Sequence, residues 1–508
     1  MTFRSGAGSD IVTPDRLPVA APPRPRGISD RWWFLLVWVT AVALFTSYHH
    51  GQIAFDTKLG VDIDPARFLG RLWPLWNPLE WFGSLQNQYI GYAIPMAPFF
   101  LLGQIAHVPV WLTERLWLSV LVTAAFAGAV RLAAALRIGS PGSRLLGGAA
   151  FALWPTFTIA MGSTSVAALP GIMMPWAVLP LVGVVRGRSG PWRAVARSGI
   201  AVALMGGVNA ALIVAVLLLP ALYICAGTGP VPARQRVRLA LAWCAAVLVA
   251  TAWWLIPLLL QGSYSFNFLP YIEQSVTTAR TMSAAAVLRG AGTWTAYLNL
   301  GGFAWIPAGW IMVTSAGPVL AASVVSATGL AGLARRDMPE RRWLAISVGV
   351  TALITMIAYY GPLSGPFSGA ALKVFDGSLA PLRSTYKFEP MAGAAIALGC
   401  AHILSRFKPP GRAYAAGGAA ALAIVLGGLA LPQLTGQEIW QGSFTSIPSY
   451  WYQAATWLDV HSPQQTAMVV PADAHGQFLW GSTSDDPLEV LADSPWTERG
   501  IVPYGNAG

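Results

Sequence analysis

The sequence predicts an all-α protein that crosses a membrane many times, and three observations support this prediction. Hydrophobic residues make up 55% of the 508 residues and charged residues only 10%, whereas a soluble domain carries about a quarter charged residues. Apolar runs close to the length of a membrane span recur along the whole chain. The basic residues gather between alternate runs, which explains the net charge of +11 without a nucleic-acid partner.

The apolar runs predict about eleven membrane-spanning helices. They cover residues 32–48, 112–135, 145–160, 166–185, 198–208, 210–226, 239–260, 308–333, 343–360, 391–404 and 413–431. Residues 93–106 form a shorter apolar run that Pro95 and Pro98 interrupt. We interpret this run as interfacial or re-entrant, because irregular backbone at membrane depth must be surrounded by protein.

Arginine clusters predict which loops face the cytoplasm. They are Arg131/Arg137/Arg144, Arg186/Arg188/Arg193/Arg197, Arg234/Arg236/Arg238, Arg335/Arg336/Arg341/Arg342 and Arg406/Lys408/Arg412. Every cluster falls in a loop that the count of spans places on one side, as the positive-inside rule requires. Residues 1–31 are polar and rich in proline and arginine, so we expect a disordered cytoplasmic tail rather than a cleaved signal.

The opposite side carries long loops with few basic residues, at residues 49–110, 261–307, 361–389 and from 432 onward. The last stretch is polar, rich in tryptophan and serine, and contains strand-like pieces. We therefore expect a membrane domain at 32–431 and the beginning of an extracytoplasmic domain at 432–508. The chain would then be a piece or a short relative of a longer protein.

Three of these outer loops carry candidate site residues. The candidates are Asp56 and Lys58 with Gln86, Asn87 and Gln88 behind them, then Glu273, and finally Arg383, Lys387 and Glu389. Basic residues are rare on this side, so Arg383 and Lys387 at the bilayer edge suit a lipid phosphate. A carboxylate such as Asp56 suits proton abstraction from a hydroxyl group.

This combination of residue types suggests glycosyl transfer from a lipid-linked phosphosugar. A phosphate leaving group is a weak base, so it needs cations that stabilise its charge rather than a general acid. One carboxylate base would then suffice, whereas a glycosidase needs two paired carboxylates. Direct displacement by an acceptor hydroxyl would invert the anomeric carbon.

Other interpretations of the same residues stay open. Asp56 could be a solvated loop acid or a partner of Lys58, and Lys387 could be a helix-end lysine that reaches the interface. Asp62 and Asp64 could bind a metal ion, or one of them could cap a helix. No nucleotide-binding or HExxH motif is present, and the spans carry few charges, which disfavours a transporter.

Ten short motifs connect this chain to a known family. They are Asp56-Thr57-Lys58, Phe82-Gly83, Gln86-Asn87-Gln88, Gly91-Tyr92, Pro95-Met96, Pro98-Phe99-Phe100, Arg115-Leu116-Trp117, Tyr271-Ile272-Glu273, Lys387-Phe388 and Trp480-Gly481. With these motifs the sequence resembles the N-terminal membrane domain of the actinobacterial α-(1→3)-arabinofuranosyltransferases. It departs from the family at Ala97, Tyr386 and Glu389, where glycine, histidine and aspartate are usual.

The resemblance implies a GT-C glycosyltransferase fold in the plasma membrane, with its active site on the extracytoplasmic face. It implies transfer of arabinofuranose, with inversion, from decaprenyl-phosphoryl arabinofuranose to a cell-wall arabinan, forming an α-(1→3) branch. Asp56 matches the catalytic base, Glu273 a second carboxylate of the cavity, and Lys387 the lysine near the lipid phosphate. We therefore predict two catalytic residues, Asp56 and Glu273. The predicted substrate-binding residues are Lys58, Arg383, Lys387, Glu389, Gln86, Asn87 and Gln88.

We expect no resident metal ion or other cofactor, although the sequence is compatible with a divalent cation. It is also compatible with an acyl carrier protein at the cytoplasmic face, where some relatives bind one. Two alternatives to an enzyme are a non-catalytic arabinan- or lipid-binding relative in cell-wall assembly and a polyprenyl-lipid transporter.

Overall fold

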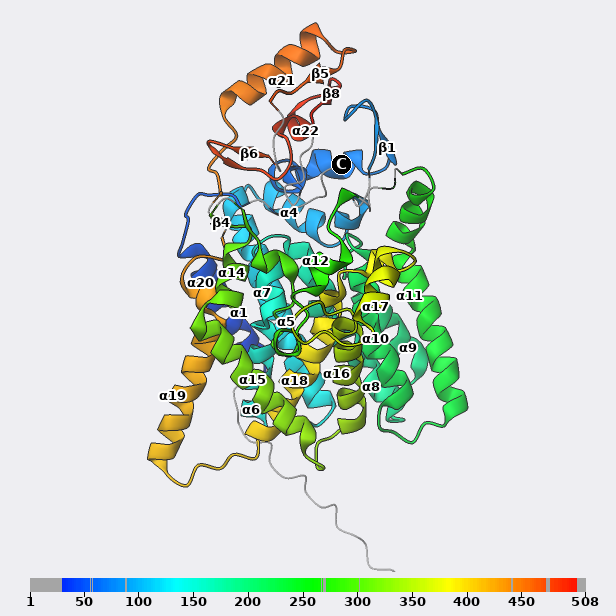
Figure 1. Ribbon diagram of the computed structural model, residues 1–508, viewed down its shortest axis with the longest axis vertical. Coiled ribbons are helices and arrows are strands. Elements are labelled where there is room, and N and C mark those ends of the chain that lie inside the picture. Colours follow the sequence, from blue (N-terminus) through cyan, green and yellow to red (C-terminus); the bar gives the residue numbers. More distant parts are fainter. Residues whose placement is uncertain are drawn as a thin grey trace, which may run out of the picture.

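The structure is a computed structural model that describes residues 30–499 except 55, 57, 87–88, 266, 268–270, 301, 440–441 and 472–475. Residues 1–29 of the predicted tail therefore lie outside the described residues, as do the candidate site residues Asn87 and Gln88. The described chain is mostly helical, with a bundle of long helices below a layer of short elements (Figure 1).

The bundle contains most of the long helices. They are α1 (Asp30–Thr46), α5 (Val110–Ala135), α6 (Pro141–Ala152), α7 (Pro155–Met161), α8 (Leu169–Val185), α9 (Pro191–Ala203), α10 (Ala210–Ala226), α11 (Ala233–Gly262), α14 (Pro307–Thr314), α15 (Ala316–Ala334), α16 (Arg341–Met356), α18 (Glu389–Leu404) and α19 (Arg412–Leu429). Among the described residues, five helical segments are long and apolar enough to cross a membrane: Val110–Ala135, Ser165–Val185, Ala233–Gly262, Ala316–Ala334 and Arg412–Leu429. The chain is therefore a multi-pass membrane protein.

Short elements occupy one end of the bundle and its connections. The helices are α2 (Leu59–Ile63), α3 (Pro65–Arg71), α4 (Met96–Ile105), α12 (Ser275–Ala279), α13 (Ala284–Leu288), α17 (Ser368–Asp376), α20 (Leu431–Leu434), α21 (Ser449–His461) and α22 (Pro487–Leu491), with 3-10 turns η1 (Tyr89–Tyr92), η2 (Ser165–Ala168), η4 (Trp294–Tyr297), η5 (Ala380–Leu382) and η6 (Thr385–Phe388). The strand pairs are β1 (Trp76–Asn77) with β2 (Ser84–Leu85), β3 (Asn299–Leu300) with β4 (Phe303–Ala304), and β6 (Gln477–Phe478) with β7 (Gly481–Ser482), all antiparallel, and β5 (Ala467–Met468) with β8 (Trp496–Thr497), parallel.

Two apolar runs that we predicted as single helices are divided in the structure. The run 145–160 is broken between α6 and α7, because Pro155 starts a new helix and holds Trp154 in an extended conformation. The run 308–333 is broken between α14 and α15, where Ser315 is extended and Pro318 lies in the first turn that follows. Hydropathy alone does not register such breaks, because both sides of each break are apolar.

The arginine-rich loops come together at one end of the bundle. Arg186, after α8, donates to the carbonyls of Ala135 and Leu136 at the end of α5, and its guanidinium forms an ion pair with Glu340 at 2.7 Å. Glu340 also accepts from the backbone N–H of Thr228, after α10. These contacts join the loops after α5, α8, α10 and α15, as the positive-inside pattern predicted. We call this end the basic face.

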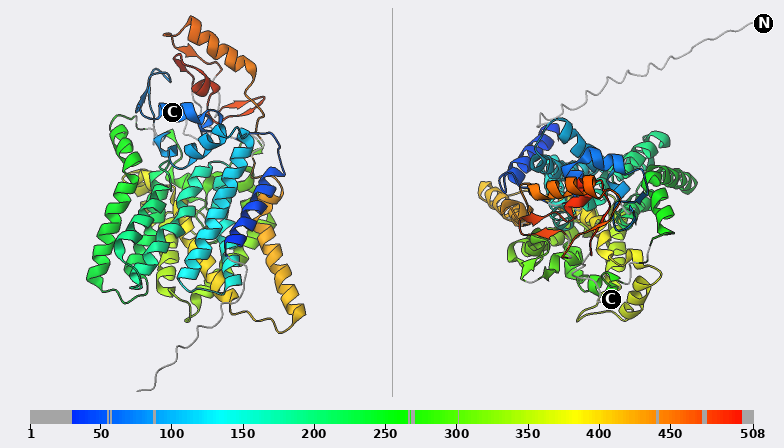
Figure 2. Two further views of the ribbon diagram at one scale, coloured as in Figure 1. Left: turned by 180° about the vertical axis from the view of Figure 1, so that it is seen from behind. Right: turned by 90° about the horizontal axis from the view of Figure 1, so that it is seen from above.

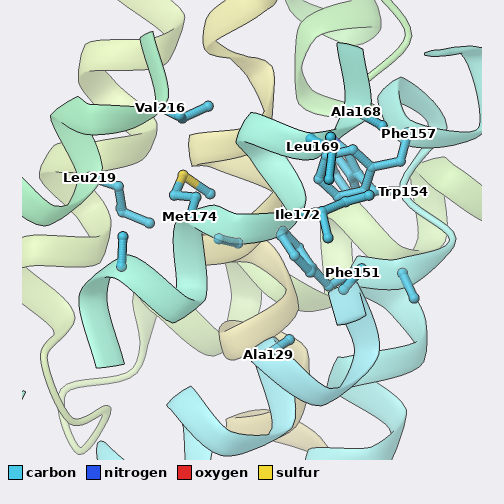
Figure 3. Packing of buried hydrophobic residues seen from close by; sticks show 14 of the residues in the cluster. Ala129, Phe151, Trp154, Phe157, Ala168, Leu169, Ile172, Met174, Val216 and Leu219 are labelled. Atoms are coloured by element: carbon cyan, nitrogen blue, oxygen red, sulfur yellow. The ribbon is translucent and has the colours of Figure 1, made fainter. Parts of the chain in front are cut away.

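Large aromatic residues fill the centre of the bundle. Trp154, Phe151 and Phe157 are buried, and the two phenylalanine rings pack edge to face with centroids 5.0 Å apart (Figure 3). Nearby, α15 and α18 approach closely because Gly329 and Gly399 lack side chains: a Cβ on Gly399 would lie 2.2 Å from the Gly329 carbonyl oxygen. Phe157 also lines one of the cavities described below.

The described residues of 432–499, which we call the C-terminal segment, cover the end of the bundle opposite the basic face (Figures 1 and 2). Ile53, in the loop after α1, exchanges two backbone hydrogen bonds with Phe444. A buried cluster then unites Ile53 and Leu59 with Phe444, Ile447 and Val490. The loop after α1 and the C-terminal segment consequently share one small hydrophobic core.

Candidate active site

Asp56 lies in the loop after α1, and its carboxylate binds the turn that precedes α8. The backbone N–H of Ser165 donates to Asp56 Oδ1 at 2.7 Å, and the Ser165 hydroxyl donates to Oδ2. Trp117 of α5 donates to the same hydroxyl oxygen at 2.8 Å. Burial raises the pKa of Asp56 to about 6, although the two hydrogen bonds from Ser165 oppose the rise. A carboxylate with such a pKa can accept a proton near neutral pH.

Lys58 does not pair with Asp56. Its Nζ forms an ion pair with Asp485 at 2.9 Å and lies 4.5 Å from the centroid of the Tyr89 ring. The backbone N–H of Leu59 donates to the other Asp485 oxygen at 3.0 Å. Burial opposes the charged form of Lys58, but the carboxylates of Asp485 and Glu489 outweigh burial and raise its pKa well above the usual value.

Asp485 was not among the site residues predicted from the sequence. It belongs to the C-terminal segment, and no local motif marks it, although the neighbouring Trp480-Gly481 is one of the family motifs. Asp485 follows Ser484, which has a left-handed backbone with φ of 65°. Such a conformation is unfavourable for a non-glycine residue and recurs at functional sites.

Asp62 and Asp64 take up different roles. The side chain of Asp64 accepts the backbone N–H of Arg67 at 3.1 Å and caps α3. Asp62 is only 3% exposed, and its pKa is raised well above the usual value by burial and by the nearby carboxylates Glu114, Asp56 and Asp485. Within the described part of the chain, no three His, Cys, Asp or Glu side chains are placed to hold a metal ion.

Glu273, Arg383 and Lys387 line the same cavity, whose volume is about 610 Å³. Arg383 Nε lies 3.5 Å from Glu273 Oε1, and Lys387 Nζ donates to Asn209 Oδ1 at 3.3 Å. The side chains of Arg383 and Lys387 are almost fully buried. Burial lowers the pKa of Lys387 to about 8, and the Glu273 carboxylate opposes this. We call this space the cationic cavity.

The walls of the cationic cavity are held by contacts from α17. Asp376, the last residue of α17, accepts from the backbone N–H of Ser275 at 2.8 Å and from its hydroxyl at 2.7 Å. The hydroxyl of Thr278 donates to the backbone carbonyl of Arg383 at 2.9 Å. Together these bonds fix the segment that follows Glu273 against the segment that carries Arg383.

A second cavity, of about 480 Å³, lies next to the first. Val208 and Asn209 line both, so the two cavities share a wall. Lys58 and Asp485 line the second cavity, and its other polar lining residues are neutral: Tyr92, Thr156, Ser163, Thr164, Asn209, Thr293, Thr295, Trp305, Tyr386 and Ser484. Asp56 does not line either cavity, but its partner Ser165 follows the lining residue Thr164. We call this space the neutral cavity.

Glu389 and Gln86 lie outside both cavities. Glu389 is fully buried at the start of α18, where it accepts the backbone N–H of Gly292 at 2.9 Å and lies 2.9 Å from the Thr156 hydroxyl. A Cβ at position 292 would lie 2.2 Å from Glu389 Oε1, so a larger residue there would displace that carboxylate. The backbone carbonyl of Gln86 accepts from the Gln261 amide at 3.2 Å, which ties β2 to α11.

Comparison with known proteins decides the family. The family model described as Alpha-(1->3)-arabinofuranosyltransferase, N-terminal GT-C domain, matches residues 39–508. The chain belongs to this family. It is 38% identical over 484 residues to the alpha-(1->3)-arabinofuranosyltransferase of Mycolicibacterium smegmatis and 36% identical over 495 residues to that of Mycobacterium tuberculosis.

Solved structures agree with this assignment. A cryo-EM structure of the arabinofuranosyltransferase AftD from mycobacteria superimposes with a TM-score of 0.73 at 33% identity, covering 92% of this chain and 32% of that one. The alignment with the Mycolicibacterium smegmatis protein covers 92% of this chain and 34% of that protein. The alignment with the Mycobacterium tuberculosis protein covers 93% of this chain and 35% of that protein. The chain thus spans about a third of these relatives and corresponds to their N-terminal GT-C domain.

Proposed function

We propose that this GT-C domain moves an arabinofuranosyl residue from decaprenyl-phosphoryl arabinofuranose to a cell-wall arabinan acceptor, with inversion, and forms an α-(1→3) branch. The observation that carries the proposal is the division of charge between two adjoining cavities. One holds two buried cations, and the other is lined by neutral polar groups and lies beside a carboxylate with a pKa of about 6.

The donor phosphate fits the cationic cavity. Arg383 offers a planar guanidinium, and Lys387 offers an ammonium group that stays charged below a pH of about 8. Both would stabilise the charge that develops on the phosphate as the glycosidic bond breaks. The partial pairing of Arg383 with Glu273, at 3.5 Å, leaves the cavity less positive than two free cations would make it.

The sugars fit the neutral cavity. Its threonine, tyrosine and asparagine side chains can hydrogen-bond to hydroxyl groups, and Trp305 offers an aromatic face. Lys58 and Asp485 cancel one another's charge on its wall. The substrate-binding role predicted for Lys58 is therefore proposed here for the sugar side of the site, where Lys58 lines the cavity and its charge is balanced by Asp485.

Asp56 serves as the base in this scheme. The oxygen of an acceptor hydroxyl attacks the anomeric carbon, its proton passes to Asp56, and the bond from that carbon to the phosphate oxygen breaks. Decaprenyl phosphate leaves with its negative charge opposed by Arg383 and Lys387. Ser165 orients the carboxylate, and its hydrogen bonds favour the deprotonated form that can accept the proton.

The same proposal places the domain in the plasma membrane with about eleven spans. The cavities and the C-terminal segment would face the cell exterior, with residues 432–508 beginning an extracytoplasmic domain. The basic face would lie in the cytoplasm, where its arginines suit an acidic acyl carrier protein. A divalent cation is not required by this mechanism.

Transfer by an Asp56→Asn variant of the full-length protein tests the mechanism. With a synthetic decaprenyl-phosphoryl arabinofuranose donor and an arabinan oligosaccharide acceptor, we expect turnover to fall by about 10²–10⁴-fold, with donor binding retained. Asp64→Asn is the matched control, because asparagine also caps a helix. Undiminished turnover in Asp56→Asn would exclude Asp56 as the base. Binding of donor and acceptor by the unmodified protein without turnover would instead indicate a non-catalytic relative.

A further inference from the structure

An apolar cavity lies between α19 and helices α6, α15 and α18, and it shares no lining residue with the cationic or the neutral cavity. Its volume is about 440 Å³, and its walls come from α6, α15, α18 and α19, including Leu146, Val325, Leu404, Gly418 and Leu422. Helix α19 lies at the edge of the bundle (Figure 1), and most of its residues are exposed in the protein alone. We call this cavity the α19 groove.

Hydrocarbon is the occupant that the lining of the groove favours. Thr328 and Cys400 are the only lining residues with a polar side-chain atom, and a water molecule needs two to four polar partners to occupy a cavity. An empty groove would lose dispersion contacts along all its walls. Since the groove lies between membrane-spanning helices, an acyl chain from the surrounding lipid is the available hydrocarbon.

The charge at one end of the groove indicates which headgroup accompanies that chain. Phe407 and Pro409 line the groove where it reaches the basic face. Lys408 and Arg412, beside them, are exposed and have no acidic partner in the described part of the chain. Asp337, which contacts the same loop through Arg406, is already paired with Arg335 and Arg406 at 2.9 Å each. Positive charge therefore remains for a phosphate group.

We propose that the α19 groove binds an acyl chain of an anionic glycerophospholipid from the leaflet at the basic face, with its phosphate near Lys408 and Arg412. This lipid would complete the packing of α19 against α15 and α18. Helix α19 leads into α20, where the Gln433 amide donates to the Thr158 hydroxyl at 3.3 Å. Thr158 follows Phe157 of the neutral cavity, so the lipid would support that wall indirectly.

Two adjacent glycines of α19 provide a matched pair of variants. A Cβ on Gly418 would point into the groove and meet only the edge of the Phe407 ring, at 3.6 Å, whereas a Cβ on Gly417 would meet nothing within 4 Å. Gly418→Leu should therefore fill the groove, and Gly417→Leu should add the same side chain outside it. Both changes raise helix propensity by the same amount, because each replaces a glycine inside α19 by leucine.

Native mass spectrometry of the protein, released from nanodiscs of phosphatidylglycerol and phosphatidylcholine in equal amounts, tests the proposal. We expect a retained phosphatidylglycerol in the unmodified protein and in Gly417→Leu, with retention about tenfold lower in Gly418→Leu. The double variant Lys408→Ala/Arg412→Ala should lose the preference for phosphatidylglycerol. The double variant Arg234→Ala/Arg238→Ala removes the same charge from exposed positions of α11 and should retain the preference for phosphatidylglycerol.

Three results would overturn the proposal. The first is equal retention in Gly418→Leu and Gly417→Leu. The second is equal retention of both lipids by the unmodified protein. The third is a dimer that Gly418→Leu alone dissociates, because a second copy would then occupy the groove. If Gly418→Leu fails to fold, the two charge variants still decide between the outcomes.

Discussion

Lys58 and Asp485 are 427 positions apart in the sequence and form an ion pair of 2.9 Å on the wall of the neutral cavity. Both side chains are largely buried, with exposures of 21% and 13%. Asp485 also accepts the backbone N–H of Leu59, so it holds the first outer loop through two separate contacts. The position of Asp56, two residues before Lys58, therefore depends on the C-terminal segment.

Removing the charge of Asp485 should destabilise the protein. Asp485→Asn leaves Lys58 buried without its partner, which costs about 3 kcal/mol when an ion pair is well buried. We expect a clear fall in the thermal unfolding temperature and reduced transfer activity. Asp493→Asn is the control, since Asp493 is 69% exposed in its pairs with Arg67 and Arg71 and should contribute less than about 1 kcal/mol. Additivity of Asp485→Asn with Lys58→Met would show that the pair is not coupled.

The pH dependence of transfer should report Asp56. Its pKa of about 6 predicts that kcat/KM falls as the pH drops below about 6, because the protonated carboxyl cannot act as a base. Ser165→Ala removes a hydrogen bond that favours the charged form, so the acidic limb should move to higher pH. Ser163→Ala, whose hydroxyl donates to the Ile159 and Ala160 carbonyls of α7, should leave the acidic limb in place. If the acidic limb does not move in Ser165→Ala, the limb does not report the titration of Asp56.

The same pKa makes a prediction about stability. Burial raises the pKa of Asp56 from 3.8 to about 6, so the folded protein binds more protons than the unfolded chain between these values. The contribution of Asp56 to stability therefore falls as the pH rises from about 4 to 6, and Asp56→Asn should lose this pH dependence. Thermal unfolding measured at several pH values in that window checks the sign.

Lys387 should govern donor affinity. A hydrogen bond to a charged group contributes about 1.5–3 kcal/mol, so Lys387→Met should raise the KM for the lipid donor by about 10- to 100-fold. Affinity in the unmodified protein should also decline as the pH rises through about 8, where Lys387 loses its proton. Lys373→Met, on the exposed side of α17, is the matched control. A donor KM that is unchanged in Lys387→Met would contradict the assignment of the cationic cavity to the phosphate.

Asp376 should act by positioning its neighbours. Asp376→Ala removes both hydrogen bonds to Ser275 and frees the segment that follows Glu273. We expect the donor KM to rise by about tenfold with little change in kcat, and Asp376→Asn to restore part of the loss because it keeps one acceptor oxygen. A fall in thermal stability with no change in donor KM, in both variants, would show that Asp376 is purely structural.

Hydropathy and the arginine clusters predicted the helical membrane body and the grouping of the basic loops. Both depend on local composition, which a single sequence displays. The prediction of unbroken helices at 145–160 and 308–333 was wrong, because Pro155 and Ser315 interrupt runs whose hydropathy stays uniform. Proline at the first position of a helix was the available signal at the first break.

The site residues that the sequence predicted are charged side chains in outer loops, next to the ends of predicted membrane spans. Glu273, Arg383 and Lys387 were singled out in this way, and the structure brings them together. Asn209 was missed, although its place after Gly206-Gly207 and before an apolar run is typical of a helix N-cap. Asp376 and Asp485 were missed because their partners lie about a hundred and about four hundred positions away, beyond the reach of local patterns.

The shared core of the first outer loop and the C-terminal segment also limits how such enzymes can exchange their outer parts. A chimera joined directly after α19 would replace Ser484 and Asp485, and with them part of the cavity wall. It would also remove Phe444, the backbone partner of Ile53. The workable crossover point for domain exchange therefore lies beyond β8, and the residues between α19 and β8 are inherited together with the membrane domain that they cover.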